Sequence, residues 1–168
     1  DITGEVLAEE ALQRSEELYR MMLEKSPSGI AVIDDNSKYI YANDEFCRLT
    51  GYPPEEIIGK DFFVFLSDES KLLAIDRYKK RQRGEAVPDR YEFIFNKKSG
   101  ERRTGEVRSS VYTDSDGHVN SMIQIIDITD RKKAEDALLV AIQEADILRE
   151  KAEQATREKD LLLKEVHH

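Results

Sequence analysis

The C-terminal part of the chain, residues 130–168, contains neither Gly nor Pro and carries a regular apolar repeat. Apolar side chains recur there at alternating spacings of three and four residues, the heptad pattern of a helix that packs along another helix. The repeat comprises Ala134, Leu138, Ala141, Ala145, Leu148, Ala152, Ala155, Leu162 and Val166, with Lys159 as its polar exception. At about 1.5 Å per residue, such a helix would be about 58 Å long. The pattern predicts a long helix that pairs with a second copy through this seam.

Alanine supplies most of the predicted seam, so two backbones can approach closely while each layer buries little apolar surface. We therefore expect a marginal coiled coil, formed by a parallel homodimer, whose seam can shift or rotate. The alternative is a single amphipathic helix that folds back on its own domain. Sustained heptads favour pairing between two chains.

A second stretch without Pro runs from about residue 5 to residue 25, and its apolar residues share one helical face. The Ser-Pro-Ser-Gly segment at residues 26–29 ends it. Residues 1–12 also match residues 127–138 at seven of twelve positions, including a shared Asp-Ile-Thr. This internal repeat indicates tandem modules. Residues 1–25 are therefore predicted to be a helix that ends the linker of a preceding module.

Between the two helical stretches, short apolar runs alternate with turn residues. Runs at 29–34 and 38–42 predict a hairpin, and runs at 91–96, 103–112 and 119–127 predict three further strands. Asn43 can cap a short helix that Gly51 would end in a left-handed conformation. This order of elements predicts an α+β domain with an antiparallel sheet.

Two further segments complete the expected core. The aromatic cluster of Phe62, Phe63 and Phe65 is predicted to fill the interior. A helix at 68–83 follows, and its expected apolar side comprises Leu72, Leu73, Ile75 and Tyr78. The basic residues 79–83 at its end suit the negative end of the helix dipole and are expected to be solvated.

Composition narrows the classes of partner. The net charge of −9 and the pI of about 5.0 argue against binding to nucleic acid or to an anionic membrane surface. No apolar run approaches the roughly 20 residues of a membrane-spanning helix. Cys47 is the only cysteine, so an internal disulfide and a cysteine-cluster metal site are excluded. We expect a cytoplasmic protein segment.

The sequence offers few of the residue arrangements that are typical of catalytic sites. The sequence contains no Gly-rich phosphate loop and no Ser/His/Asp or paired-carboxylate arrangement, so this segment is not expected to be an enzyme by itself. Four polar side chains could reach an interior ligand, and each has an alternative role as a structural hydrogen-bonding group: Asn43, Arg90, Ser109 and Gln124.

Several motifs resemble those of PAS sensor domains. They are the Ser-Pro-Ser-Gly-Ile-Ala-Val-Ile-Asp segment at 26–34, Tyr-Ala-Asn-Asp-Glu-Phe-Cys-Arg-Leu-Thr-Gly-Tyr at 41–52, and the closing Asp-Ile-Thr at 127–129. The resemblance covers residues 26–129 and implies a five-stranded antiparallel sheet in the order 2-1-5-4-3 with flanking helices. In this position, Asp127 and Thr129 could relay strain in the sheet to the long helix, or Thr129 could serve as a plain helix cap.

The resemblance also bears on cofactors. Haem-binding PAS sensors use a histidine on the helix before the third strand, and the segment 68–83 has none, while His118 lies beside a turn. Photochemical flavin relatives use a cysteine in a later helix, whereas Cys47 comes early in the chain. Histidine-ligated haem and cysteinyl-flavin are therefore not expected. Non-covalent flavin or a small metabolite stays open.

The end of the chain resembles the start of the phosphoacceptor box of sensor histidine kinases. By that pattern His168 would accept phosphate, and His167 is the weaker candidate. Both would face outward from the seam, where an ATP-binding kinase domain and a response-regulator receiver could reach them. A remnant affinity tag or an ordinary charged helix end would also explain the pair.

Together these features predict a sensory and signal-transmission module of a two-component histidine kinase. A signal detected by the PAS core would pass through the parallel coiled coil to His168. One alternative is a ligand-free PAS module that only dimerises or acts as a spacer. Another is a PAS sensor that feeds a different output, such as a nucleotide cyclase.

Overall fold

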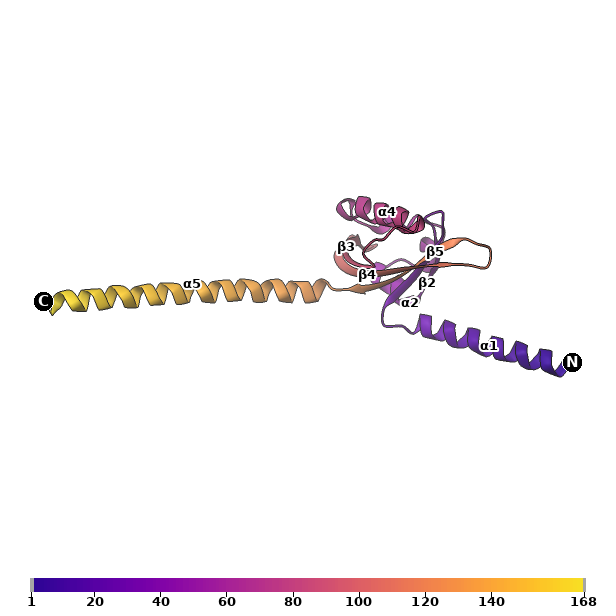
Figure 1. The fold of residues 1–168 in the computed structure, drawn as a ribbon, viewed down its shortest axis with the longest axis horizontal. Helices are drawn as coiled ribbons and strands as arrows, with labels where there is room; N and C mark the ends of the chain where they lie inside the picture. The colour runs from indigo at the N-terminus through magenta and orange to yellow at the C-terminus, as the bar shows by residue number, and fades with distance from the viewer. Residues whose placement is uncertain (1, 168) are drawn as a thin grey trace. The chain divides into compact units, whose positions relative to one another are not determined.

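Five strands form an antiparallel sheet in the order β2-β1-β5-β4-β3, and short helices pack against one of its faces (Figure 1). The computed structural model describes residues 2–167. The strands are β1 (Gly29–Ile33), β2 (Tyr39–Ala42), β3 (Arg90–Asn96), β4 (Arg102–Thr113) and β5 (Val119–Asp127). The helices are α1 (Ile2–Glu24), α2 (Asp44–Thr50), α3 (Pro54–Ile57), the 3-10 turn η1 (Phe62–Phe65), α4 (Asp68–Gln82) and α5 (Thr129–Val166). The predicted α+β fold and strand order are confirmed.

Burial alternates along the central strands, as expected for a sheet with one covered face. In β5, Ile123 and Ile125 are buried, whereas Ile126 is exposed. The register places Val107 and Ser109 of β4 opposite Ile125 and Ile123, and both are buried. These side chains form the floor on which the helices pack.

Aromatic rings fill much of the space above this floor. Phe62 and Phe65 are buried and Phe63 is partly buried, which confirms the prediction that this cluster belongs to the core. A Cβ atom at Gly105 of β4 would lie 2.9 Å from the ring of Phe93 on β3, so a larger residue there would force this ring to move. Rings pair at centroid distances of 4.8–5.7 Å in Tyr39–Phe46, Tyr39–Phe65, Tyr52–Phe65, Phe62–Phe63, Phe62–Tyr78 and Phe93–Phe95.

The short helix α2 begins and ends where the sequence predicts. Asn43 has an extended backbone, and its side-chain oxygen accepts a hydrogen bond of 2.9 Å from the backbone N–H of Phe46. Gly51 ends the helix with a φ of 78°, a left-handed conformation that glycine adopts without strain. Its N–H donates to the carbonyl oxygen of Cys47.

Helix α4 corrects one expectation about which of its sides faces the core. Leu72 and Leu73, expected on the buried side, are 78% and 47% exposed. Tyr78 is buried as expected and Ile75 is partly buried, while Ala74 and Arg81 complete the buried row. Hydrogen bonding explains this rotation, because the Tyr78 hydroxyl donates to the carbonyl oxygen of Asp34 and accepts a 3.1 Å hydrogen bond from the N–H of Ser37. These contacts anchor α4 to the β1–β2 turn.

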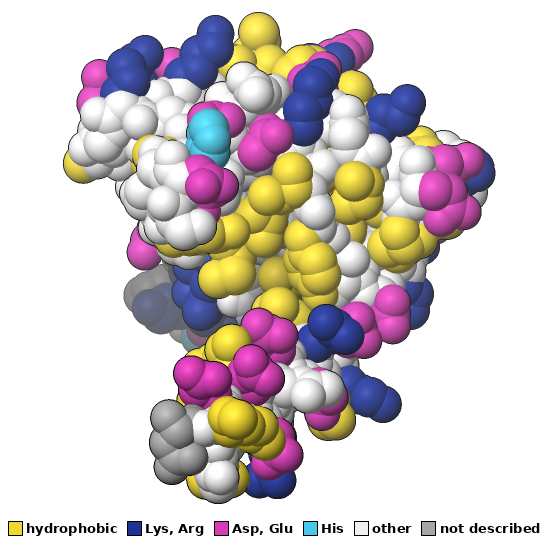
Figure 2. Space-filling model, turned by 90° about the vertical axis from the view of Figure 1, so that its right-hand side faces the viewer, with side chains coloured by type: hydrophobic (Ala, Val, Ile, Leu, Met, Phe, Trp, Pro, Cys, Tyr) yellow, Lys and Arg dark blue, Asp and Glu magenta, His cyan; other side chains and the backbone are white. Residues whose placement is uncertain are grey.

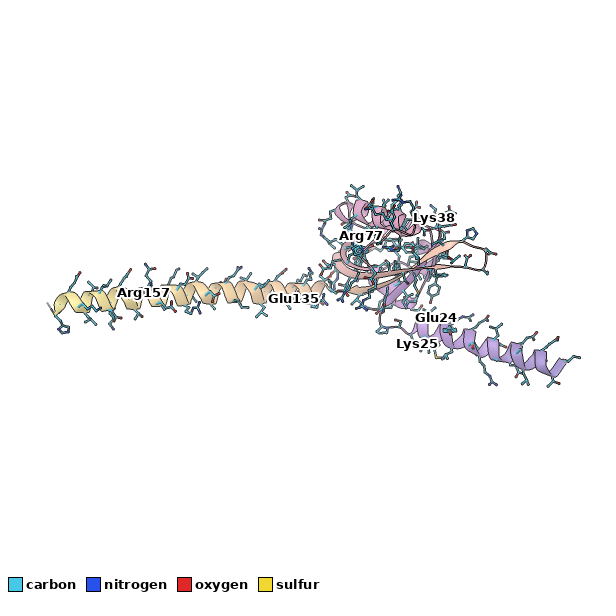
Figure 3. The ribbon with its side chains drawn as sticks, in the orientation of Figure 1. Glu24, Lys25, Lys38, Arg77, Glu135 and Arg157 are labelled. Atoms are coloured by element: carbon cyan, nitrogen blue, oxygen red, sulfur yellow. The ribbon has the colours of Figure 1, made fainter. Side chains whose placement is uncertain are left out.

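The two terminal helices differ from the short ones in their exposure. None of the described residues of α1 is buried, and Thr129 is the only buried residue described in α5. The chain divides after Ile128 into two units, the second of which is α5. Side chains project from all sides of α5, from Glu135 near its start to Arg157 toward its end (Figure 3). At 38 residues, α5 is about 57 Å long.

None of the described helices combines the length and the apolar character that crossing a membrane requires.

Candidate functional site

The interior of the domain contains two small cavities between the sheet and its covering helices. The larger has a volume of about 40 Å³ and the smaller about 20 Å³. One ordered water needs roughly 10–15 Å³ measured in this way. The larger cavity therefore has room for about three water-sized groups. A flavin or a haem would fit only if the packed aromatic rings moved apart.

Two polar side chains line the larger cavity among mostly apolar ones. Arg81 is only 9% exposed, and Ser109 is equally buried on β4. The expectation that the basic residues 79–83 are all solvated is therefore wrong for Arg81. Arg81 follows Ala74 and Tyr78 at helical spacing, which would have placed it on the side of α4 that faces the core. Leu72 and Leu73 instead suggested that another side of the helix is buried.

Asn43 lies at the centre of a buried hydrogen-bond network. Its Oδ1 accepts from the N–H of Ile30 at 2.8 Å as well as from Phe46. Its Nδ2 donates to the carbonyl oxygens of Leu23 at 2.6 Å and Ser28 at 3.1 Å. The Asn43 amide thus accepts two hydrogen bonds and donates two, all to backbone groups, and these bonds join α1, β1 and α2.

Arg90 and Gln124 lie on the other face of the sheet. They line an open hollow of about 470 Å³ together with Leu23, Arg108 and Met122. Arg90 also pairs with the buried carboxylate of Glu106 at 2.9 Å. Ser109 touches both this hollow and the interior cavity, so the four predicted pocket residues do not converge on one site.

Exposed apolar side chains accompany this outer face. They include Ile40, Met122 and Ile126. Figure 2 shows hydrophobic side chains gathered on one side of the protein with charged side chains around them.

The junction between β5 and α5 is held by a charged hydrogen bond. Asp127 Oδ2 accepts from Arg103 Nε at 2.8 Å, and the two side chains are only 14% and 18% exposed. The hydrogen bond to Asp127 raises the pKa of Arg103 above its ordinary value, so the guanidinium stays charged. The next residue, Ile128, is buried and donates its N–H to Thr104 O at 2.9 Å. Thr129, also buried, is the first residue of α5.

The predicted seam residues of α5 are exposed in the single chain. Leu138, Leu148, Leu162 and Val166 are 62–78% exposed. The smaller members Ala141, Ala145, Ala152 and Ala155 are exposed as well. His167 is exposed at the end of the helix, and His168 lies outside the described residues.

The thiol of Cys47 is poorly suited to covalent chemistry. It is half-buried in α2, and burial together with the nearby carboxylates of Asp44 and Glu55 raises its pKa. A raised pKa keeps the thiol protonated near neutral pH. Among the described residues, no group of three or more His, Cys, Asp or Glu side chains could hold a metal ion.

A curated relative of this chain is a bacterial sensor. The C4-dicarboxylate transport sensor protein DctS of Rhodobacter capsulatus is 26% identical over 130 residues, which cover 76% of this chain and 20% of that protein. The chain therefore spans about a fifth of the length of this relative.

Solved structures share the same fold. The PAS domain of an HTR-like protein from Haloarcula marismortui superposes with a TM-score of 0.57 at 21% identity, over 72% of this chain and 98% of that one. A sensory box histidine kinase/response regulator from Burkholderia thailandensis superposes with a TM-score of 0.56 at 20% identity, over 75% and 95%.

A family match covers all five strands and the short helices that pack on the sheet. The model of the PAS fold matches residues 17–128, two thirds of the chain. The relative DctS is a sensor protein, and two-component sensor histidine kinases contain domains of the same fold. The chain belongs to the PAS fold family and is a sensory domain followed by a long C-terminal helix.

Proposed function

We propose that this chain is the sensory and signal-transmission module of a two-component histidine kinase. The observation that carries the proposal is the covalent passage from the last strand of the PAS sheet into α5 beside the Arg103–Asp127 hydrogen bond. A change in the sheet would alter the position of Asp127 relative to β4. Because Thr129 follows two residues later, that change would reach the first turn of the helix.

The exposed seam of α5 supports the second step. Large apolar side chains at Leu138, Leu148 and Leu162 would be covered if two copies paired in parallel. The intervening alanines allow close backbone approach with little buried area per layer. Two arrangements of such a seam can differ by little free energy, so a small input could favour one over the other.

The output would be a phosphoacceptor histidine. In a parallel pair with the proposed register, His168 occupies an outward position beyond Val166. An ATP-binding kinase domain and a response-regulator receiver, both in other parts of the signalling system, would meet the imidazole there. The sensor role of the relative DctS is consistent with this output.

Cysteine crosslinking along α5 tests the relay. Single cysteines would be placed from 134 to 166 in a Cys47→Ala background, with Asp127→Ala as a variant that uncouples the junction. The proposal expects crosslinks every three to four residues along the seam and a changed pattern in the uncoupled variant. Identical patterns in both proteins contradict the relay, and equal crosslinking at seam and outward positions contradicts the pairing.

A second candidate function is a dimerisation or spacer module that binds no ligand. The small volume of the interior cavities, about 40 and 20 Å³, favours it. Native mass spectrometry of the purified protein separates the two candidates. A bound small molecule supports sensing by ligand, whereas an unliganded dimer whose kinase output ignores every change in the PAS core supports the spacer.

A further inference from the structure

Arg81 is a buried cation on the inner row of α4. It follows Ala74 and Tyr78 at helical spacing, and only 9% of its surface is exposed. A guanidinium keeps its charge at any ordinary pH, so it cannot avoid burial by losing its proton. An unpaired buried charge destabilises a fold by several kcal/mol. Such a group therefore calls for an anionic or strongly polar partner.

The protein supplies no such partner among residues 2–167. No hydrogen bond or ion pair joins the side chain of Arg81 to another described residue, and of its three guanidinium nitrogens Nη2 is the one shielded from solvent without an acceptor. Several other arginines of the domain have a carboxylate or an aromatic ring as partner. Arg90 and Arg103 pair with carboxylates. Arg77, one turn earlier on α4 and labelled in Figure 3, also has a buried nitrogen without an acceptor, Nη1, but its guanidinium lies 4.3 Å from the centre of the Tyr91 ring and gains a cation–π contact there.

A second unsatisfied polar group lies at the same cavity. Ser109 Oγ, on the floor of the sheet, is buried without a hydrogen-bond partner. It lines the 40 Å³ cavity together with Arg81. The remaining described lining side chains are apolar or aromatic, and none is a carboxylate. Arg81 from α4 and Ser109 from β4 thus line the same small cavity, each has a buried polar atom without a partner, and the described lining carries no negative charge.

We propose that this cavity binds a small planar oxyanion, of the class of formate, acetate, nitrate or bicarbonate. The planar fork of a guanidinium matches two oxygens of such an anion, and a serine hydroxyl can donate to the same or a third oxygen. Room for about three water-sized groups suits an anion of three or four non-hydrogen atoms. The aromatic lining would exclude water from the ion pair and strengthen it.

The biological role of the anion site rests on the proposed sensory function, because the bound anion would be the signal. Binding would draw α4 toward β4, because Arg81 and Ser109 belong to these two elements. β4 also carries Arg103, the partner of Asp127. The ligand site and the junction to α5 thus share one strand.

Thermal unfolding and amide NMR of the complete chain test the site. Sodium formate, acetate, nitrate and bicarbonate would be titrated against sodium chloride at equal ionic strength, with succinate as an oversized carboxylate. We expect at least one planar oxyanion to raise the Tm in a saturable way. The amide signals of Ser109 and Arg81 should shift with the same dissociation constant.

Matched variants test whether the anion binds at Arg81 and Ser109. Arg81→Met should weaken anion binding at least tenfold and should raise the Tm in anion-free buffer, because it removes an unpaired buried charge. Ser109→Ala tests the floor of the site with a change that keeps the fold, and should also weaken binding. Arg83→Met is the control, since Arg83 is exposed and pairs with Glu85. It should leave binding unchanged.

Three results would contradict the anion site. The first is that no planar oxyanion raises the Tm in a saturable way, which would mean a cavity that holds water alone. The others are an equal rise in Tm for Arg81→Met, or tighter binding of succinate than of every small anion. These results leave the signalling role untouched. Conversely, a protein that binds the anion through Arg81 but whose kinase output ignores it contradicts the sensory role and keeps the site.

Discussion

Arg103 Nε donates to Asp127 Oδ2 across 2.8 Å, and this hydrogen bond ties β4 to the residue at which β5 ends. The register supports the contact, because Asp127 stands opposite Gly105, two residues along β4 from Arg103. Both side chains are mostly buried, so they bind in a medium that screens charge less than water does. Removing the pair therefore tests the proposed relay against a plain helix cap.

A double-mutant cycle measures this contact. Arg103→Ala and Asp127→Ala should each lower the free energy of unfolding by about 1–3 kcal/mol, because each removes a mostly buried hydrogen bond between charged groups, although Asp127→Ala leaves Arg103 its 2.9 Å ion pair with Glu101. The double variant should lose less than the sum. Chemical denaturation followed by circular dichroism gives the values. Arg102 and Glu69, an exposed pair on neighbouring elements, serve as the control and should couple by less than about 1 kcal/mol. Additive losses for Arg103 and Asp127 would argue against the junction.

Asn43→Ala should be among the most destabilising polar substitutions in the domain. It removes an N-cap and leaves the partly buried N–H of Ile30 without its acceptor. We expect a loss of about 2–4 kcal/mol in the free energy of unfolding. Asn36→Ala, at an exposed turn position, is the matched control and should change stability by less than about 0.5 kcal/mol. A loss for Asn43→Ala as small as that of the control would mean that the network contributes little.

Gly105→Ala should destabilise the domain because the new Cβ would lie 2.9 Å from the Phe93 ring. Overpacking of this kind lowers the free energy of unfolding by about 1–3 kcal/mol. Gly4→Ala offers the contrasting case, since nothing lies within 4 Å of its added Cβ and the position is helical. It should be neutral or stabilising by up to about 1 kcal/mol. Equal thermal stabilities for the two variants would contradict the packing described for β4.

His118 should titrate above its usual pKa of about 6.5. Its Nδ1 lies 2.8 Å from Asp35 Oδ2, and this hydrogen bond and the charges of Asp35 and Asp114 raise the pKa of the imidazole. A raised pKa in the folded state means that the pair stabilises the fold below the unfolded-state pKa, and that the effect fades as the pH rises through the folded-state pKa. NMR titration should find a lower pKa for His118 in Asp35→Asn. The same value in both proteins would exclude the pair in solution.

Local features of the fold could be predicted from the residues, and contacts distant in sequence could not. The cap at Asn43, the stop at Gly51 and the burial of Phe62 follow from residue type and short spacing. The strand order came from the resemblance to PAS domains rather than from periodicity. The buried side of α4 was mispredicted because Leu72 and Leu73 suggested a phase that the hydrogen bonds of Tyr78 override.

The site was harder to predict for a related reason. Asn43, Arg90, Ser109 and Gln124 are polar residues of strands and strand ends, but which sheet face each one occupies depends on register. Arg81 was assigned to solvent because charged residues at a helix end are usually solvated. The pairing of Arg103 with Asp127 joins residues 24 positions apart and required the register of β4 against β5.

The central claim is that two copies of α5 lie side by side in the same direction. A single spin label at Glu165→Cys, in a Cys47→Ala background, tests it directly by the distance between the two labels of a dimer. Glu165 flanks the seam near the end of the helix, so parallel pairing predicts one narrow distance distribution below about 25 Å. Antiparallel pairing would place the labels roughly a helix length apart, above about 40 Å. That longer distance, or a monomer without dipolar coupling at high protein concentration, would contradict the account.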